Sequence, residues 1–81
     1  MNIGISEDWK LCGYDAGKDE AVILREDADW IKELTSNIKA TNDRTVIRQA
    51  EHDFHAEMLQ RYGGKVAGAL LMKLWQATAK G

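Results

Sequence analysis

Residues 44–79 read RTVIRQAEHDFHAEMLQRYGGKVAGALLMKLWQATA, and this stretch decides the fold. Apolar side chains recur at almost every fourth position up to Tyr62, which predicts a helix over residues 44–62. Gly63 and Gly64 end this helix, since glycine commonly follows a last helical turn. A wider apolar arc then predicts another helix over residues 65–79.

An earlier helix is predicted over residues 27–40. Acidic residues open this segment, where the positive end of the helix dipole favours them. An apolar stripe then runs at helical spacing from Trp30 to Ile38. Asp43 or Thr41 is placed to cap the helix that follows.

The N-terminal part of the chain has strand character. Residues 8–14 divide their apolar side chains between two sides, and residues 21–24 form an apolar run bounded by charges, as in a short buried strand. Residues 15–19, between them, have the composition of a turn. These features predict a β-hairpin over residues 8–24. The alternative is a helix starting at Ser6, which two interior glycines would weaken.

Together these elements predict one α+β domain over residues 1–81, with a short N-terminal β-hairpin followed by two to three α-helices. The alternative is an all-α small helical bundle. The side chains expected in the core are Trp30, Leu34, Ile38, Ile47, Phe54, Met58, Leu71 and Leu74.

The composition indicates the cellular compartment in which such a chain is expected. Cys12 is the only cysteine, so no internal disulfide forms, and a reducing compartment is favoured. The longest apolar run, residues 69–72, is far shorter than the roughly 20 residues of a membrane span. No signal peptide is visible at the N-terminus. We therefore expect a cytoplasmic protein without a membrane partner.

Charge is spread unevenly along the chain. Residues 1–40 carry nine acids and five bases, and residues 41–81 carry four acids and six bases. The acidic half could engage a basic partner or mimic nucleic acid. Its candidate partner-binding residues are Asp15, Asp19, Glu20, Glu26, Asp27 and Asp29.

The last predicted helix carries more apolar surface than one small core covers, and its only charges are lysines. Surplus apolar surface indicates contact with a partner protein or with a second copy of the chain. Single aromatic side chains often anchor such interfaces. The candidates here are Leu70, Met72 and Trp75, and the contact with a second copy would be a homodimer through the C-terminal helix.

Chemically reactive residues are few. His52 and His55 lie three positions apart on a helix and could face one ion, but a third ligand and the specific His-Glu-x-x-His spacing are missing from the sequence. A solvated polar face is the expected interpretation, and metal binding by this pair stays open. Cys12, Ser6 and Ser36 lie in no recognisable nucleophile motif. We expect no enzymatic activity and no cofactor.

The predicted function is therefore protein–protein interaction, as a small regulator, adaptor or inhibitor that would suit a phage-like accessory gene. The alternative is a helix-turn-helix-like regulator that binds nucleic acid, because two helices meet at Gly63 and Gly64. Its second helix offers base edges only Gln76 and two lysines, and the net charge is −2. Nucleic acid is thus the less favoured partner.

Overall fold

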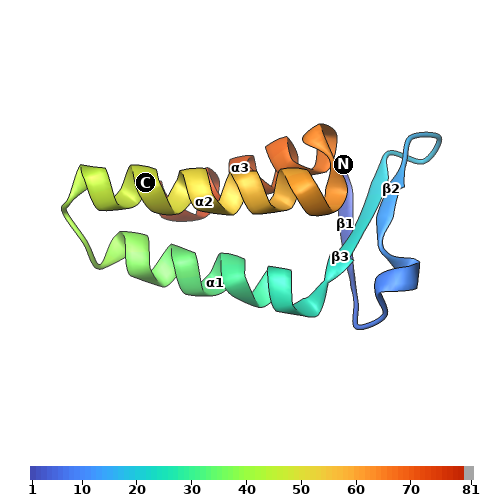
Figure 1. Ribbon diagram of the computed structural model, residues 1–81, viewed down its shortest axis with the longest axis horizontal. Helices are drawn as coiled ribbons and strands as arrows, with labels where there is room; N and C mark the ends of the chain where they lie inside the picture. The colour runs from blue at the N-terminus through green and yellow to red at the C-terminus, as the bar shows by residue number, and fades with distance from the viewer. Residues whose placement is uncertain (80–81) are drawn as a thin grey trace.

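A computed structural model describes residues 1–79 of the chain. Its elements, in order, are strand β1 Asn2–Ser6, a single-turn 3-10 helix η1 Trp9–Leu11, strands β2 Gly13–Asp15 and β3 Glu20–Leu24, and helices α1 Arg25–Lys39, α2 Arg44–Tyr62 and α3 Gly64–Thr78. The predicted α+β class is confirmed, and the all-α alternative is set aside. Figure 1 shows the sheet at one end of an elongated molecule, with the helices extending away from it.

The sheet has the strand order β1-β3-β2. Strands β2 and β3 form the predicted antiparallel hairpin, in which Tyr14 pairs with Ala21. Strand β1 was not predicted, and it pairs in parallel with β3, so that Ile3 also lies beside Ala21. Only two apolar residues mark β1 in the sequence, and they flank Gly4, which leaves too short a pattern to identify a strand.

The first strand of the hairpin is shorter than expected. Trp9 and Leu11, which were placed in it, belong to η1 instead. The side chain of Asp8 accepts a hydrogen bond from the backbone N–H of Lys10 at 3.0 Å and so caps this turn. The side chains of Trp9 and Leu11 are 52% and 67% exposed, which removes the burial that alternation would have given them in a strand.

The helices agree with the predicted segments to within two residues at each end. Asp43 caps α2, because its carboxylate accepts hydrogen bonds from the backbone N–H groups of Thr45 and Val46. Gly63 alone separates α2 from α3, and its φ of 87° lies in a region that residues with a Cβ rarely adopt. The chain reverses there, so α3 runs back along α2.

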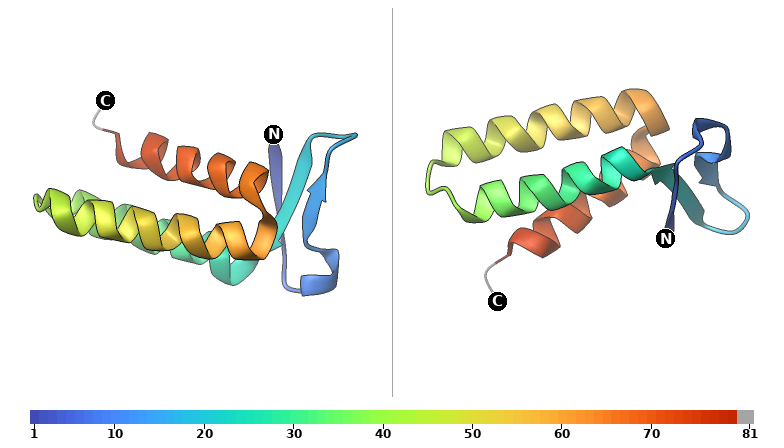
Figure 2. Two further views of the ribbon diagram at one scale, coloured as in Figure 1. Left: turned by 45° about the horizontal axis from the view of Figure 1, so that its top comes forward. Right: turned by 90° about the horizontal axis from the view of Figure 1, so that it is seen from below.

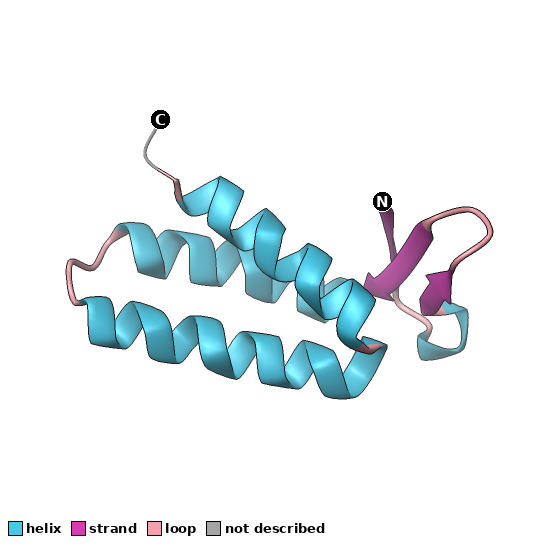
Figure 3. Ribbon diagram, turned by 90° about the horizontal axis from the view of Figure 1, so that it is seen from above, coloured by secondary structure: helices cyan, strands magenta, loops and turns pink. Residues whose placement is uncertain are grey.

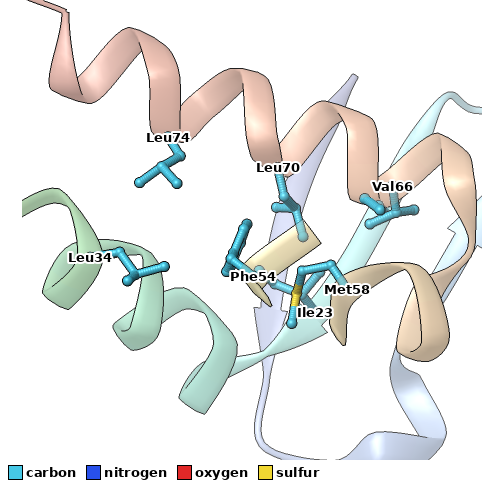
Figure 4. Close-up of a cluster of buried hydrophobic side chains, with 9 residues drawn as sticks. Ile23, Leu34, Phe54, Met58, Val66, Leu70 and Leu74 are labelled. Atoms are coloured by element: carbon cyan, nitrogen blue, oxygen red, sulfur yellow. The ribbon is translucent and has the colours of Figure 1, made fainter. Parts of the chain in front are cut away.

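The core lies between the three helices and the helix-facing side of β3 (Figure 4). Leu34, Phe54, Met58 and Leu74 were predicted there and are buried. Of the other four predicted residues, Trp30, Ile38 and Leu71 pack against the core partly buried, whereas Ile47 lines a surface hollow beside Arg44 and Arg48. The remaining fully buried apolar side chains are Ala21, Ile23, Val66, Ala67 and Leu70.

Helix α3 lies across both other helices and begins beside the sheet, as the two views of Figure 2 and the view of Figure 3 show. One face of the sheet packs on this helical layer, because Ala21 and Ile23 are buried on that side. Within residues 1–79, no helix has the length and apolar character needed to cross a membrane.

Candidate interaction surface

The exposed face of α3 is formed by Met72 and Trp75, whose relative exposures are 55% and 51%. The two residues are three positions apart, so their side chains are neighbours on the helix surface. The indole N–H of Trp75 donates a hydrogen bond to the carboxylate of Glu51 on α2. This contact holds the ring at the seam between α2 and α3 while leaving about half of it exposed. We call Met72 and Trp75 the α3 face.

A groove borders the α3 face on the side of the sheet. It has a volume of about 390 Å³. Its walls come from the N-terminal end of the chain and from α3, and the residues that line it are Met1, Ile3, Gly68, Ala69, Met72, Lys73 and Gln76. The α3 face therefore extends from this groove, at Met72, to the α2–α3 seam, at Trp75.

Leu70 does not belong to the α3 face, which corrects its prediction as a partner-binding residue. Its exposure is 0%. Leu70 lies four positions after Val66 and four before Leu74, so all three occupy the same side of α3. That side faces the core (Figure 4), and the surplus apolar surface of the helix is the neighbouring strip that carries Met72 and Trp75.

The six acidic candidates fall into two groups rather than one surface. Asp15, Asp19 and Glu20 lie around the hairpin turn, from the last residue of β2 to the first residue of β3, and the other three lie in the first turns of α1, after β3. Strand β3 spans five residues, which separates the two groups by its whole length.

The acids of the hairpin turn are engaged by nearby groups. The carboxylate of Asp15 accepts hydrogen bonds from the backbone N–H groups of Gly17 and Lys18, which shapes the turn. The carboxylate of Asp19 accepts a hydrogen bond of 3.0 Å from the hydroxyl of Tyr14 and lies 3.4 Å from the N-terminal ammonium. The Tyr14 hydrogen bond, and then the ammonium charge, lower the pKa of Asp19.

Asp27 is buried, which corrects its prediction as a surface residue. Its exposure is 2%, and the Arg61 guanidinium donates a hydrogen bond of 2.8 Å to its carboxylate. The hydroxyl of Tyr62 donates to the other oxygen of the same carboxylate. Glu26 is exposed but lies 3.1 Å from Arg61, so its charge is also partly balanced. Only Asp29 of this group is exposed with no ion pair among residues 1–79.

Sequence reasoning missed the cluster of Asp27, Arg61 and Tyr62. This cluster joins the start of α1 to the end of α2. The Tyr62 hydroxyl also accepts a hydrogen bond of 2.9 Å from the backbone N–H of Leu24. The ring of Trp9 lies against that of Tyr62, with centroids 5.6 Å apart. No local pattern signals this cluster, because Asp27 and its two partners are more than thirty residues apart in the chain.

The phenol of Tyr62 and the thiol of Cys12 are both held in their protonated forms. Burial, and then the hydrogen bond to Asp27, raise the pKa of Tyr62. Burial, and then the negative charges of Asp27 and Asp8, raise the pKa of Cys12. The thiolate, rather than the thiol, is the reactive form of cysteine, so these shifts disfavour Cys12 as a nucleophile.

The two histidines differ in burial, because His52 is exposed on α2 whereas His55 is partly buried. The side chain of His52 is 79% exposed, and its Nδ1 lies 3.8 Å from the carboxylate of Asp53. Over residues 1–79, no three or more His, Cys, Asp or Glu side chains gather in an arrangement that could hold a metal ion.

Helices α2 and α3 meet at a tighter junction than a helix-turn-helix uses. A helix-turn-helix joins two helices at about 90–120° through a turn of three to four residues. Here Gly63 is the only residue between them, and the contact of Trp75 with Glu51 shows that the helices remain adjacent far from the junction. Gln76 and Lys73, two of the side chains that such a helix would offer to base edges, line the groove that also contains Ile3 of β1.

Comparisons with protein-family models, with curated proteins and with solved structures found no match to this chain.

Proposed function

We propose that this chain is a non-enzymatic protein–protein interaction module, acting as a small regulator, adaptor or inhibitor through the α3 face. The observation that carries the proposal is the exposure of about half of Trp75 and Met72 on one helix face. A large aromatic ring held by a hydrogen bond to Glu51 loses little side-chain freedom when it binds. Aromatic side chains with this property are common interface anchors.

The acidic residues support the proposal less well. They form two separate groups, Asp27 is buried, and neighbouring cations lie close to Glu26 and Asp19. A basic partner would therefore meet a divided surface whose charge is partly balanced. The α3 face is continuous, and apolar burial is the stronger source of binding free energy.

The expected partner offers an apolar pocket with acidic residues at its rim. Over its fifteen residues, α3 carries no acid, and its charged side chains are Lys65 and Lys73. Charges at the rim of an interface mainly steer association, whereas the buried anchor limits dissociation. We propose that the protein meets this partner in the cytoplasm, which its single cysteine supports.

The test is affinity capture from an extract of the native cell at low and at high salt. The bait proteins are the wild type, the double variant Met72→Ala/Trp75→Ala and the control Val46→Ala, which removes a side chain of similar exposure, 54%, from α2. We expect the wild type and the control to retain the same partner at both salt concentrations. The double variant should lose it.

Two results would contradict the proposal. Full retention by the double variant would exclude the α3 face, and loss of binding at high salt by every bait would point to the acidic groups instead. A gel-shift assay with random duplex DNA at low salt tests the nucleic-acid alternative, which predicts retardation. We expect none, because the chain has a net charge of −2.

A further inference from the structure

Strand β1 forms an edge of the sheet that lacks the usual protection. It lies outermost in the order β1-β3-β2, and its five residues, NIGIS, include no charge and no proline. Natural edge strands are commonly blocked by charged side chains, proline, bulges or extreme shortness. The opposite edge, β2, has only three residues and ends at a charged one, Asp15. The two edges are therefore not equivalent.

The free backbone groups of β1 belong to Ile3 and Ile5. The backbone N–H of Asn2 donates to the carbonyl of Asp19 at 3.2 Å, so Asn2 points toward β3. Successive residues of a strand point to opposite sides, which directs the N–H and C=O groups of Ile3 and Ile5 outward. Beyond the ladder with β3, no backbone hydrogen bond within residues 1–79 engages either residue.

The groove described above lies next to this edge. Ile3 of β1 and Met72 of α3 both line it, and no residue of β3 is among the lining residues found within residues 1–79. The groove is therefore beyond the outer side of β1. A strand added to β1 would lie about 4.8 Å further out, with alternate side chains directed toward α3.

We propose that the occupant is β1 of a second copy of this chain, so that the homodimer contact expected on the C-terminal helix lies along β1. The segment Ile3-Gly4-Ile5 reads the same in both directions. Antiparallel pairing centred on Gly4 places each Ile3 opposite Ile5 of the second copy. Both are the residues with outward backbone groups, and directly opposed residues of this type exchange two hydrogen bonds.

The side chains are complementary in the same register. Ile3 and Ile5 share the helix-facing side of the sheet, because they lie beside buried Ala21 and Ile23. Ile5 is 48% exposed in the single chain, and pairing directs it into the groove of the second copy, against Met72. The contact has two-fold symmetry, because each chain inserts its Ile5 side chain into the groove of the other chain.

The other side of the paired strands is equally compatible. The two Gly4 residues face each other at the two-fold axis, where opposed Cα atoms come within about 4.5 Å. Asn2 lies opposite Ser6 of the second copy, which brings two polar, uncharged side chains together. Since β1 carries no charge, the two copies meet without like-charge repulsion along the strand.

Sedimentation equilibrium over a wide range of concentrations tests the dimer. We expect a dimer for the wild type and for the control Leu11→Lys, which places a lysine at a 67% exposed apolar site on η1. The variant Ile5→Lys should be monomeric, because its ammonium group would enter an apolar groove that already contains Lys73. Circular dichroism should show the same folded state for all three proteins. A monomeric wild type, or a dimeric Ile5→Lys variant, would overturn the proposal.

Cysteine cross-linking tests the register. Gly4→Cys is made in a Cys12→Ser background, so each chain has a single thiol. A Cβ at position 4 fits the fold, since its nearest side-chain atom is Cγ2 of Val22 at 3.7 Å. Mild oxidation should give a covalent dimer at low protein concentration, whereas the control Gly17→Cys, in the hairpin turn, should stay monomeric. Equal cross-linking of both variants would contradict pairing about Gly4. Met72 lines the groove and also belongs to the α3 face, whereas Trp75 does not line the groove. Trp75→Ala should therefore weaken partner capture and leave the cross-linking at position 4 unchanged, which distinguishes failure of one proposal from failure of the other.

Discussion

The guanidinium of Arg61, in the last turn of α2, lies 2.8 Å from the buried carboxylate of Asp27, in the first turn of α1. Tyr62 donates a second hydrogen bond to that carboxylate and accepts one from the backbone of Leu24, where β3 passes into α1. One carboxylate therefore joins three elements at the boundary between the helices and the sheet. A buried charge is tolerated only when it is paired and hydrogen-bonded in this way.

Replacing Arg61 alone should be costly. Arg61→Met removes the cation and leaves the Asp27 carboxylate with Tyr62 as its side-chain donor, so we expect a loss of about 2–3 kcal/mol in the free energy of unfolding. This is below the cost for fully buried pairs because the Arg61 side chain is 32% exposed. Urea unfolding measures the loss.

The double variant Asp27→Leu/Arg61→Met is the matching control. Removing both charges removes the unpaired carboxylate, so the double variant should be more stable than Arg61→Met alone. With the single variant Asp27→Leu measured as well, the departure of the double variant from the sum of the two single losses gives the coupling free energy between the two residues. A purely additive result would show that Arg61 does not stabilise the Asp27 carboxylate.

Two apolar residues of α3, Leu70 and Met72, should differ widely in the stability lost on truncation. Leu70→Ala should lower the free energy of unfolding by about 2–5 kcal/mol, because Leu70 is fully buried and its loss leaves a cavity. Met72→Ala, two positions later, should change it by less than about 0.5 kcal/mol, because that side chain is 55% exposed. Thermal or urea unfolding of both variants is the measurement. Similar losses for both would mean that Met72 is packed in the core.

The helices could be predicted from the sequence because each has its own periodic apolar pattern and its own residues that mark where it begins or ends. Asp43 and Gly63 mark the bounds of α2, and the structure uses both for capping and chain reversal. Leu70 could not be assigned in this way. Apolar side chains cover most of the circumference of α3, so their spacing alone does not distinguish the side that faces the core from the α3 face.

Contacts between residues far apart in the chain could not be predicted from the sequence, for a different reason. Asp27 reads as a favourable first-turn acid of a helix, and Arg61 reads as a favourable last-turn base. Both local readings are correct, but neither reveals that the two side chains meet. The parallel pairing of β1 with β3 is hidden similarly, since the partner strand follows only after η1 and β2.

Removing the cap of α2 should have a moderate effect. Asp43→Ala leaves the backbone N–H groups of Thr45 and Val46 without their side-chain acceptor, so we expect a loss of about 1 kcal/mol in the free energy of unfolding. Asp43→Ser should recover most of this loss, because serine also caps helices well. Equal losses for the two variants would indicate a role of the negative charge rather than of the cap.

Alkaline pH should weaken the fold through Tyr62. Its pKa in the folded state is raised above the ordinary value of 10 by burial and by the hydrogen bond to Asp27. The unfolded chain therefore loses this proton first as pH rises. The stabilisation is complete below pH 10 and declines progressively above it, toward the folded-state pKa. Urea unfolding at a series of pH values should show this decline in the wild type.

Two tyrosine variants isolate the effect. Tyr62→Phe should be less stable at neutral pH, because it lacks the hydrogen bonds to Asp27 and Leu24, yet its stability should fall less steeply above pH 10 than that of the wild type. Tyr14→Phe removes the other phenol and keeps Tyr62 as the only tyrosine, so its tyrosinate absorbance should appear late and together with unfolding. Ionisation of that single phenol near pH 10 in a chain that is still folded would contradict a buried, hydrogen-bonded Tyr62.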